Sequence, residues 1–132
     1  MQEISTKDAA EMLAIYNLSF ARPWREDDME QLLSSPATSG FIVENCGFIL
    51  YQKVEGEAEI ITIAVRPEER RKGFASLLLE RLQEQSSSIF LEVNITNQAA
   101  VNFYKKHGFT EIGLRKKYYD DKDDALVMRY DS

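Results

Sequence analysis

A short basic segment that follows an apolar run is the part of this sequence whose residue types most directly suggest chemistry. It reads Arg70-Arg71-Lys72-Gly73-Phe74-Ala75, and leucines at helical spacing begin at Leu77. Gly73 allows the backbone to turn sharply, and the small Ala75 leaves the first turn of the following helix open to a ligand. The amides and positive dipole end of a helix start attract anions, and three adjacent cations add full charges. The segment is therefore a candidate site for a pyrophosphate group.

Two other phosphate-binding patterns are absent from this segment, which contains neither Gly-x-x-x-x-Gly-Lys-Ser/Thr nor Gly-x-Gly-x-x-Gly. A basic helix start is also common as a merely solvated surface, so both interpretations stay open on these residues alone. The net charge of −6 argues against nucleic-acid binding, because neutralising phosphates requires a basic face. Ten of the sixteen Lys and Arg residues fall within 66–81 and 105–117, which favours a local anionic ligand.

Composition indicates an ordinary globular protein, with 44% hydrophobic and 29% charged residues in a chain of 132. The apolar runs are far shorter than the roughly 20 residues that span a bilayer, and the N-terminus lacks a basic-then-apolar signal pattern. We therefore expect one domain over residues 1–132, a cytoplasmic location and no membrane partner. One cysteine, Cys46, and one histidine, His107, provide no metal-ligand set, so we expect no metal.

Apolar spacing and turn residues predict the elements that position the basic segment. Helices are expected from about residue 6 to 18, after Trp24, from Gly73 to about 86, and from a cap at Asn97 to 105–108. Strands are expected at 41–43, 47–54, 58–65, 89–93, 109–118 and 125–130, with the acidic 120–124 as the last connecting loop. The predicted class is α+β, a mixed and mostly antiparallel sheet of about six to seven strands flanked by about four helices.

Two motifs resemble the GNAT acetyltransferase family. Val65-x-Pro67-x-x-Arg70-x-x-Gly73-x-Ala75 is similar to the family's Gln/Arg-x-x-Gly-x-Gly/Ala coenzyme A loop, and Asn97-x-x-Ala100-x-x-Phe103-Tyr104-x-x-x-Gly108-Phe109 resembles its later motif. The resemblance covers nearly the whole chain and is greatest to the bacterial RimI type, which acetylates the N-terminal alanine of a small-subunit ribosomal protein. It implies a GNAT-like fold, acetyl-CoA as co-substrate, and the N-terminus of a basic ribosomal protein as acceptor.

The resemblance also implies roles for individual residues. Glu92 matches the base that takes the amine's proton, and Tyr104 matches the acid that protonates the leaving thiolate. Asn97 matches a contact to the pantetheine arm. The implied contacts to the thioester and the pyrophosphate are made by Ile63, Ala64, Val65, Arg70, Arg71, Lys72, Gly73, Phe74, Ala75 and Ser76. Without the family context, Glu92 is a solvent-facing acid, Tyr104 a core aromatic and Asn97 a helix cap.

Substrate choice depends on residues where the resemblance is less complete. Trp24 and Tyr118-Tyr119 match positions that line a peptide groove. Asn94, however, stands where many relatives carry Arg, and Ala75 replaces the commoner Gly. Two alternatives therefore stay open: a GNAT enzyme that acetylates a small amine such as a polyamine or antibiotic, and a non-catalytic regulatory domain that binds coenzyme A. The ratio of peptide to small-amine activity distinguishes the first alternative, and any turnover excludes the second.

Overall fold

The computed structural model describes residues 1–19, 25–119 and 123–132. Trp24 lies outside the described residues, and the side chains of Tyr118 and Tyr119 are likewise not described, so the predicted peptide groove stays a prediction. The elements in chain order are β1 (Gln2–Glu3), a 3₁₀ turn η1 (Thr6–Asp8), α1 (Ala9–Ser19), α2 (Glu26–Ser34), β2 (Thr38–Val43), β3 (Gly47–Val54), β4 (Glu57–Val65), a 3₁₀ turn η2 (Pro67–Glu69), α3 (Phe74–Glu84), β5 (Ser88–Asn94), α4 (Gln98–Lys106), β6 (Thr110–Tyr119) and β7 (Asp123–Asp131).

The strands form one sheet in the order β1-β2-β3-β4-β5-β7-β6. Every neighbouring pair is antiparallel except β4 and β5, which run parallel. The predicted class of a mixed, mostly antiparallel α+β sheet is confirmed, with seven strands and four α-helices among the described residues. In the same part of the chain, no helix is both long and apolar enough to cross a bilayer.

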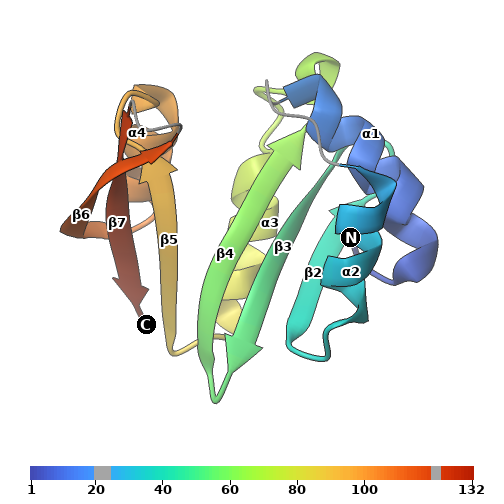
Figure 1. The fold of residues 1–132 in the computed structure, drawn as a ribbon, viewed down its shortest axis with the longest axis horizontal. Helices are drawn as coiled ribbons and strands as arrows, with labels where there is room; N and C mark the ends of the chain where they lie inside the picture. The colour runs from blue at the N-terminus through green and yellow to red at the C-terminus, as the bar shows by residue number, and fades with distance from the viewer. Residues whose placement is uncertain (20–24, 120–122) are drawn as a thin grey trace.

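Helices cover both faces of the sheet and bury two separate cores (Figure 1). On one face Leu78 and Leu82 of α3 pack with Ile49 of β3. On the other, Met12 of α1 and Met29 of α2 pack with further residues of β3. Because successive side chains of a strand point to opposite faces, β3 contributes to both cores.

The parallel pair of β4 and β5 is joined only at one end. Its register covers three residue pairs, from Glu57 and Ser88 to Glu59 and Phe90. Beyond these pairs the two strands diverge, and Figure 1 shows the V that they form, with β4 in green and β5 in yellow. At the wide end of that V, β4 leads into the basic segment. The chemistry predicted for this protein is therefore expected at that end.

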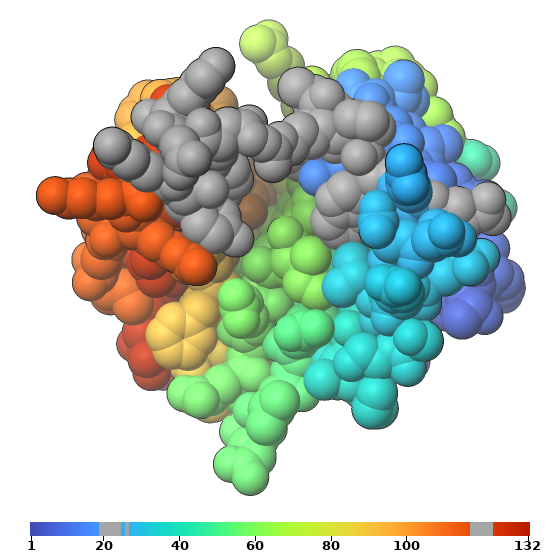
Figure 2. Space-filling model, in the orientation of Figure 1, coloured from blue at the N-terminus to red at the C-terminus, as the bar shows by residue number. Residues whose placement is uncertain are grey.

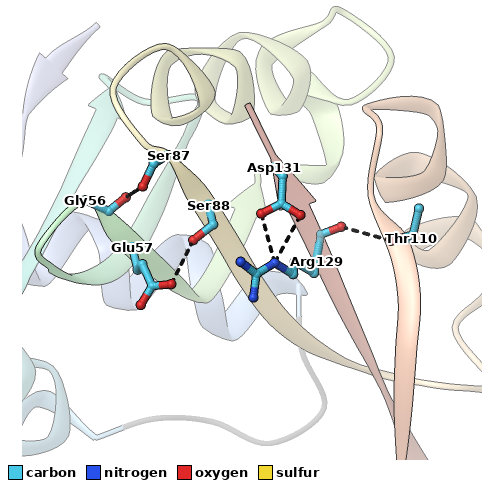
Figure 3. A network of polar contacts seen from close by, with 7 residues as sticks. All are labelled: Gly56, Glu57, Ser87, Ser88, Thr110, Arg129 and Asp131. Atoms are coloured by element: carbon cyan, nitrogen blue, oxygen red, sulfur yellow. Dashed lines mark hydrogen bonds and ion pairs between the residues drawn. The ribbon is translucent and has the colours of Figure 1, made fainter.

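Serine contacts hold the narrow end of the V together (Figure 3). The backbone amide and the hydroxyl of Ser87 both donate to the carbonyl of Gly56, at 2.9 and 3.0 Å. The hydroxyl of Ser88 donates to a carboxylate oxygen of Glu57 at 3.3 Å. These bonds connect the turn before β4 to the start of β5, so the two strands share a fixed origin from which they separate.

A bulge in β4 sets the direction of its last residues. Leu50 of β3 pairs with Thr62 and Tyr51 pairs with Ile60, which leaves Ile61 as an extra residue. As a result, Ile60 and Ile63 both pack on the α3 side, although three positions separate them, while Ile61 packs on the other side. A bulge bends a strand and changes the direction in which the following side chains point. This bulge therefore changes the direction of the end of β4 that leads into the basic segment.

Several predicted boundaries are wrong by a few residues. The loop predicted at 120–124 is wrong at its last two residues, because Asp123 and Asp124 belong to β7, where the carbonyl of Asp124 accepts the amide of Ile95 at 3.0 Å. The first helical segment begins at residue 6 as predicted, but its first three residues form the 3₁₀ turn η1 and the α-helix starts at Ala9; β1 was not predicted at all. A two-residue strand such as β1 carries no alternation of its own, since its pairing with β2 defines it.

Candidate active site

The basic segment is a loop with two left-handed residues. After β4 and η2, Arg71 has φ 65° and Gly73 has φ 86°. A left-handed residue within a turn gathers successive backbone amides into a concave, anion-binding surface. The side chain of Arg70 fixes the loop to the preceding strand, since its Nε donates to the carbonyl of Val65 at 3.2 Å.

The start of α3 supplies further donors. The first helical hydrogen bond runs from the amide of Leu77 to the carbonyl of Gly73 at 3.0 Å. The amides of Phe74, Ala75 and Ser76 therefore precede the first helical hydrogen bond, as they do at every helix start. No acidic residue lies in this first turn, so nothing there competes with an external anion for the positive end of the helix.

A pocket of about 220 Å³ lies against this loop and helix start. It brings together seven of the predicted cofactor residues and two that were not predicted. Its lining consists of Val65, Glu69, Arg70, Arg71, Gly73, Phe74, Ala75, Ser76 and Phe103. A Cβ added at Gly73 would meet no protein atom within 4 Å, so the space beside that glycine is open. The amides, the cations and this open space fit a pyrophosphate group.

The two unpredicted lining residues each had a sequence signal. Glu69 stands three residues before Lys72, a spacing that allows an ion pair, and the Lys72 Nζ lies 3.0 Å from its carboxylate. This pairing partly neutralises an acid that would otherwise repel a phosphate, whereas Lys72 itself is not part of the pocket lining. Phe103 belongs to the later family motif. It lies on α4, and it lines the pocket because α4 packs on the same face of the sheet as α3.

The backbone of β4 contributes at the wide end of the V. The amide of Arg66 donates to the carbonyl of Cys46 at 2.7 Å, on the side of β3. Because amides alternate between the two edges of a strand, those of Ile63 and Val65 face β5, where β4 no longer has a strand partner. Of the three predicted thioester contacts, Ala64 is the exception, since its amide faces β3.

Glu92 lies on β5 with its side chain on the face opposite α3. Its neighbours Leu91 and Val93 are buried in the α3-side core, and Glu92 alternates with them. Its carboxylate is held by Arg115 of β6, whose Nη1 lies 3.0 and 3.3 Å from the two oxygens. Figure 2 shows this face of the sheet, where α2 lies beside β3 and no described helix lies over the yellow and red surfaces of β5 and β7.

Tyr104 and Asn97 lie on the other side of the sheet, in and before α4. The Tyr104 ring packs edge-on against Phe103 and Phe109, with centroids 5.3 and 5.4 Å away. It is thus beside the pocket, because Phe103 is part of the pocket lining. Asn97 caps α4, since its side-chain oxygen accepts the amide of Ala100 at 3.2 Å. The structure does not bring Asn97 into the pocket lining.

The fold and this site define a class of protein. A mixed sheet whose parallel pair opens beside an anion-binding loop, with an acid on one face and a tyrosine on the other, is the arrangement of an acetyl-CoA-dependent N-acetyltransferase. The acetyltransferase (GNAT) family profile matches residues 9–109, and the chain belongs to this family.

Individual relatives narrow the comparison. The [ribosomal protein bS18]-alanine N-acetyltransferase of Escherichia coli K12 is 30% identical over 142 residues, covering 97% of this chain and 96% of that protein. The crystal structure of the Escherichia coli ribosomal-protein-S18-alanine N-acetyltransferase superposes with a TM-score of 0.87 at 27% identity, covering 98% of this chain and 91% of the other. Ard1 from Thermoplasma volcanium superposes with a TM-score of 0.84 at 29% identity, covering 98% and 95%.

The open space beside Gly73 leads to a first prediction. Asparagine tolerates left-handed φ better than other residues with a side chain, so Gly73→Asn should keep the loop conformation while filling the pocket. We expect acetyl-CoA to bind about tenfold more weakly or worse, equivalent to about 1.4 kcal/mol, by calorimetry.

Gly108→Asn is the matched control for this prediction. Gly108 also has positive φ, at 89°, and its added Cβ would meet only the Tyr130 ring, at 3.5 Å. That variant should bind acetyl-CoA as the wild type does. Equal affinities in Gly73→Asn and wild type would exclude the pocket as the cofactor site.

Proposed function

We propose that this protein transfers the acetyl group of acetyl-CoA to the α-amine of a protein N-terminus. The observation that carries the proposal is the opening between β4 and β5, with the anion-binding pocket on one face of the sheet and Glu92 on the other. Such an opening lets a cofactor and an acceptor approach one reacting point from opposite sides. The names of the relatives support an N-terminal α-amine as the acceptor.

We further propose a basic ribosomal protein, with an N-terminal alanine, as the acceptor. The Escherichia coli relative is named for that substrate, and the match extends over 97% of this chain. Residues 1–59 hold eleven acidic and four basic residues, so this first part of the chain, which ends within β4, attracts a basic partner. A ribosomal substrate would place the reaction in the cytoplasm.

The cofactor is bound through the loop and the start of α3. Backbone amides and the side chains of Arg70 and Arg71 hold the pyrophosphate, while Phe103 packs against the apolar arm beside it. When bound, acetyl-CoA supplies an acetyl group activated as a thioester. The amides of Ile63 and Val65 donate hydrogen bonds to the carbonyl oxygen as negative charge develops on it, and preorganised donors of this kind are often the largest catalytic contribution.

Proton transfer is divided between two residues on opposite faces. Glu92 accepts the proton of the acceptor amine, directly or through water, so that the nitrogen lone pair can attack. Tyr104 donates its phenolic proton to the sulfur as the carbon–sulfur bond breaks. An α-amine has a pKa of about 7.7–8.0, against about 10.4 for lysine, so a carboxylate is a sufficient base for an N-terminus.

Replacing Glu92 tests the base through its dependence on pH. Glu92→Gln is nearly isosteric, and we expect kcat/KM for a peptide beginning with alanine to fall about a hundredfold at pH 7. The deficit should narrow severalfold by pH 9, because the free amine loses its proton without help above its pKa of about 8. A deficit that stays constant across this range would show that Glu92 only attracts the peptide by its charge.

Replacing Tyr104 tests the acid. Tyr104→Phe keeps the ring packing against Phe103 and Phe109, so we expect kcat to fall by about a hundredfold or more with little change in acetyl-CoA affinity. Tyr130→Phe is the matched control, because its ring also packs on Phe109, at 5.5 Å. Similar turnover in both variants would return Tyr104 to a purely structural role.

The acceptor is tested by blocking the α-amine. Peptides that begin with alanine should be acetylated at the N-terminus, and mass spectrometry locates the added group. A peptide with a blocked α-amine and a free internal lysine should not react, and spermidine should react much more slowly than the free peptide. Rapid acetylation of the blocked peptide or of spermidine would overturn the N-terminal proposal, and acetyl-CoA binding without any release of thiol would indicate a regulatory domain.

A further inference from the structure

The ion pair between Arg115 and Glu92 joins two strands that are not neighbours. Glu92 lies on β5, Arg115 lies on β6, and β7 runs between them. Adjacent strands are about 4.8 Å apart, so the arginine side chain reaches across roughly 10 Å of sheet to make this contact. By contrast, Arg129 of β7 pairs with Asp131 on its own strand (Figure 3).

The strand register explains how the contact is possible. Arg115 is opposite Ala125, whereas Glu92 is opposite Val127, one step further along the same face. The Arg115 side chain therefore crosses β7 diagonally, from the row of Ala125 to the row of Val127, whose partner on β6 is Gly113. Gly113 has no positive φ, and a Cβ there would make only an ordinary contact of 3.9 Å with Val127.

The contact leaves the carboxylate able to accept a proton. One nitrogen, Nη1, lies against both oxygens of Glu92, at 3.0 and 3.3 Å. A carboxylate offers about four lone-pair directions, so one shared donor occupies only part of them. The contact also fixes the rotation of the carboxyl group, which a single bond to one oxygen would not do. A pair this exposed, with the Arg115 side chain 58% accessible, contributes little to stability.

We propose that Arg115 is a positioning residue, which holds the Glu92 carboxylate in the orientation that accepts the proton of the acceptor amine. This inference rests on the proposed function and adds a residue to its machinery. In the step itself, a nitrogen–hydrogen bond of the acceptor ammonium breaks and an oxygen–hydrogen bond forms on Glu92. The freed nitrogen lone pair then bonds to the acetyl carbon. Arg115 keeps its proton throughout, and it acts only by fixing where the receiving oxygen lies.

A double-mutant cycle tests the proposal with the alanine peptide and acetyl-CoA. Arg115→Gln should lower kcat about tenfold to a hundredfold, the cost of misplacing a catalytic group by about 1 Å, with little change in the KM of the peptide. Added to Glu92→Gln, it should lower kcat no further than about twofold, because a residue that acts through Glu92 has no role once the base is gone. Arg115→Lys should recover only part of the activity, since an ammonium lacks the planar geometry of guanidinium.

Arg129→Gln is the matched control, an ion-paired arginine on the same face that does not contact Glu92. It should keep wild-type kcat, and all variants should keep the wild-type thermal midpoint and affinity for acetyl-CoA. Independent, multiplying losses in the double mutant, or a change confined to KM, would overturn the positioning role while leaving the acetyltransferase proposal intact. No thiol release by the wild type with any peptide would overturn both.

Discussion

The partial pairing of β4 with β5 is the constraint on which the rest of the structure depends. Each strand is paired along its whole length on its other edge. There β4 pairs with β3 from Glu57 to Val65, and β5 pairs with β7 over seven residue pairs. Their inner edges can therefore separate without unfolding either strand. The serine contacts at Ser87 and Ser88 fix the narrow end, so the separation has a defined direction and a defined apex.

A parallel strand pair also requires a crossover connection, and here that connection carries the candidate cofactor pocket. The chain leaves β4 at the wide end of the V, passes through η2 and the basic loop, and returns through α3 to the start of β5. The helix start and its amides consequently lie beside the opening. Anion binding at this point needs no basic protein, because the dipole, the amides and a few cations act locally within a chain of net charge −6.

Separating the strands also divides the chemistry between the two faces of the sheet. The pocket and Tyr104 lie with α3 and α4, whereas Glu92 lies on the opposite face. An acceptor that approaches Glu92 therefore does not compete with the cofactor for space. The same face carries Arg115, so both side chains of the proposed proton transfer from the amine belong to strands, which hold positions more rigidly than loops.

The sequence by itself predicted most of the elements and a candidate anion-binding loop, because these depend on local spacing. The helical repeat after Gly73 and the stop near Gly108 indicate their helices without any tertiary information. The parallel pairing, the bulge at Ile61 and the reach of Arg115 to Glu92 were decided only by the tertiary structure. Each of these joins residues that are distant in the chain, and no local pattern encodes which strand lies beside which. The sequence could thus name Glu92 as a candidate base and Tyr104 as a candidate acid, but only the arrangement of the strands placed them on opposite faces of the sheet beside one opening.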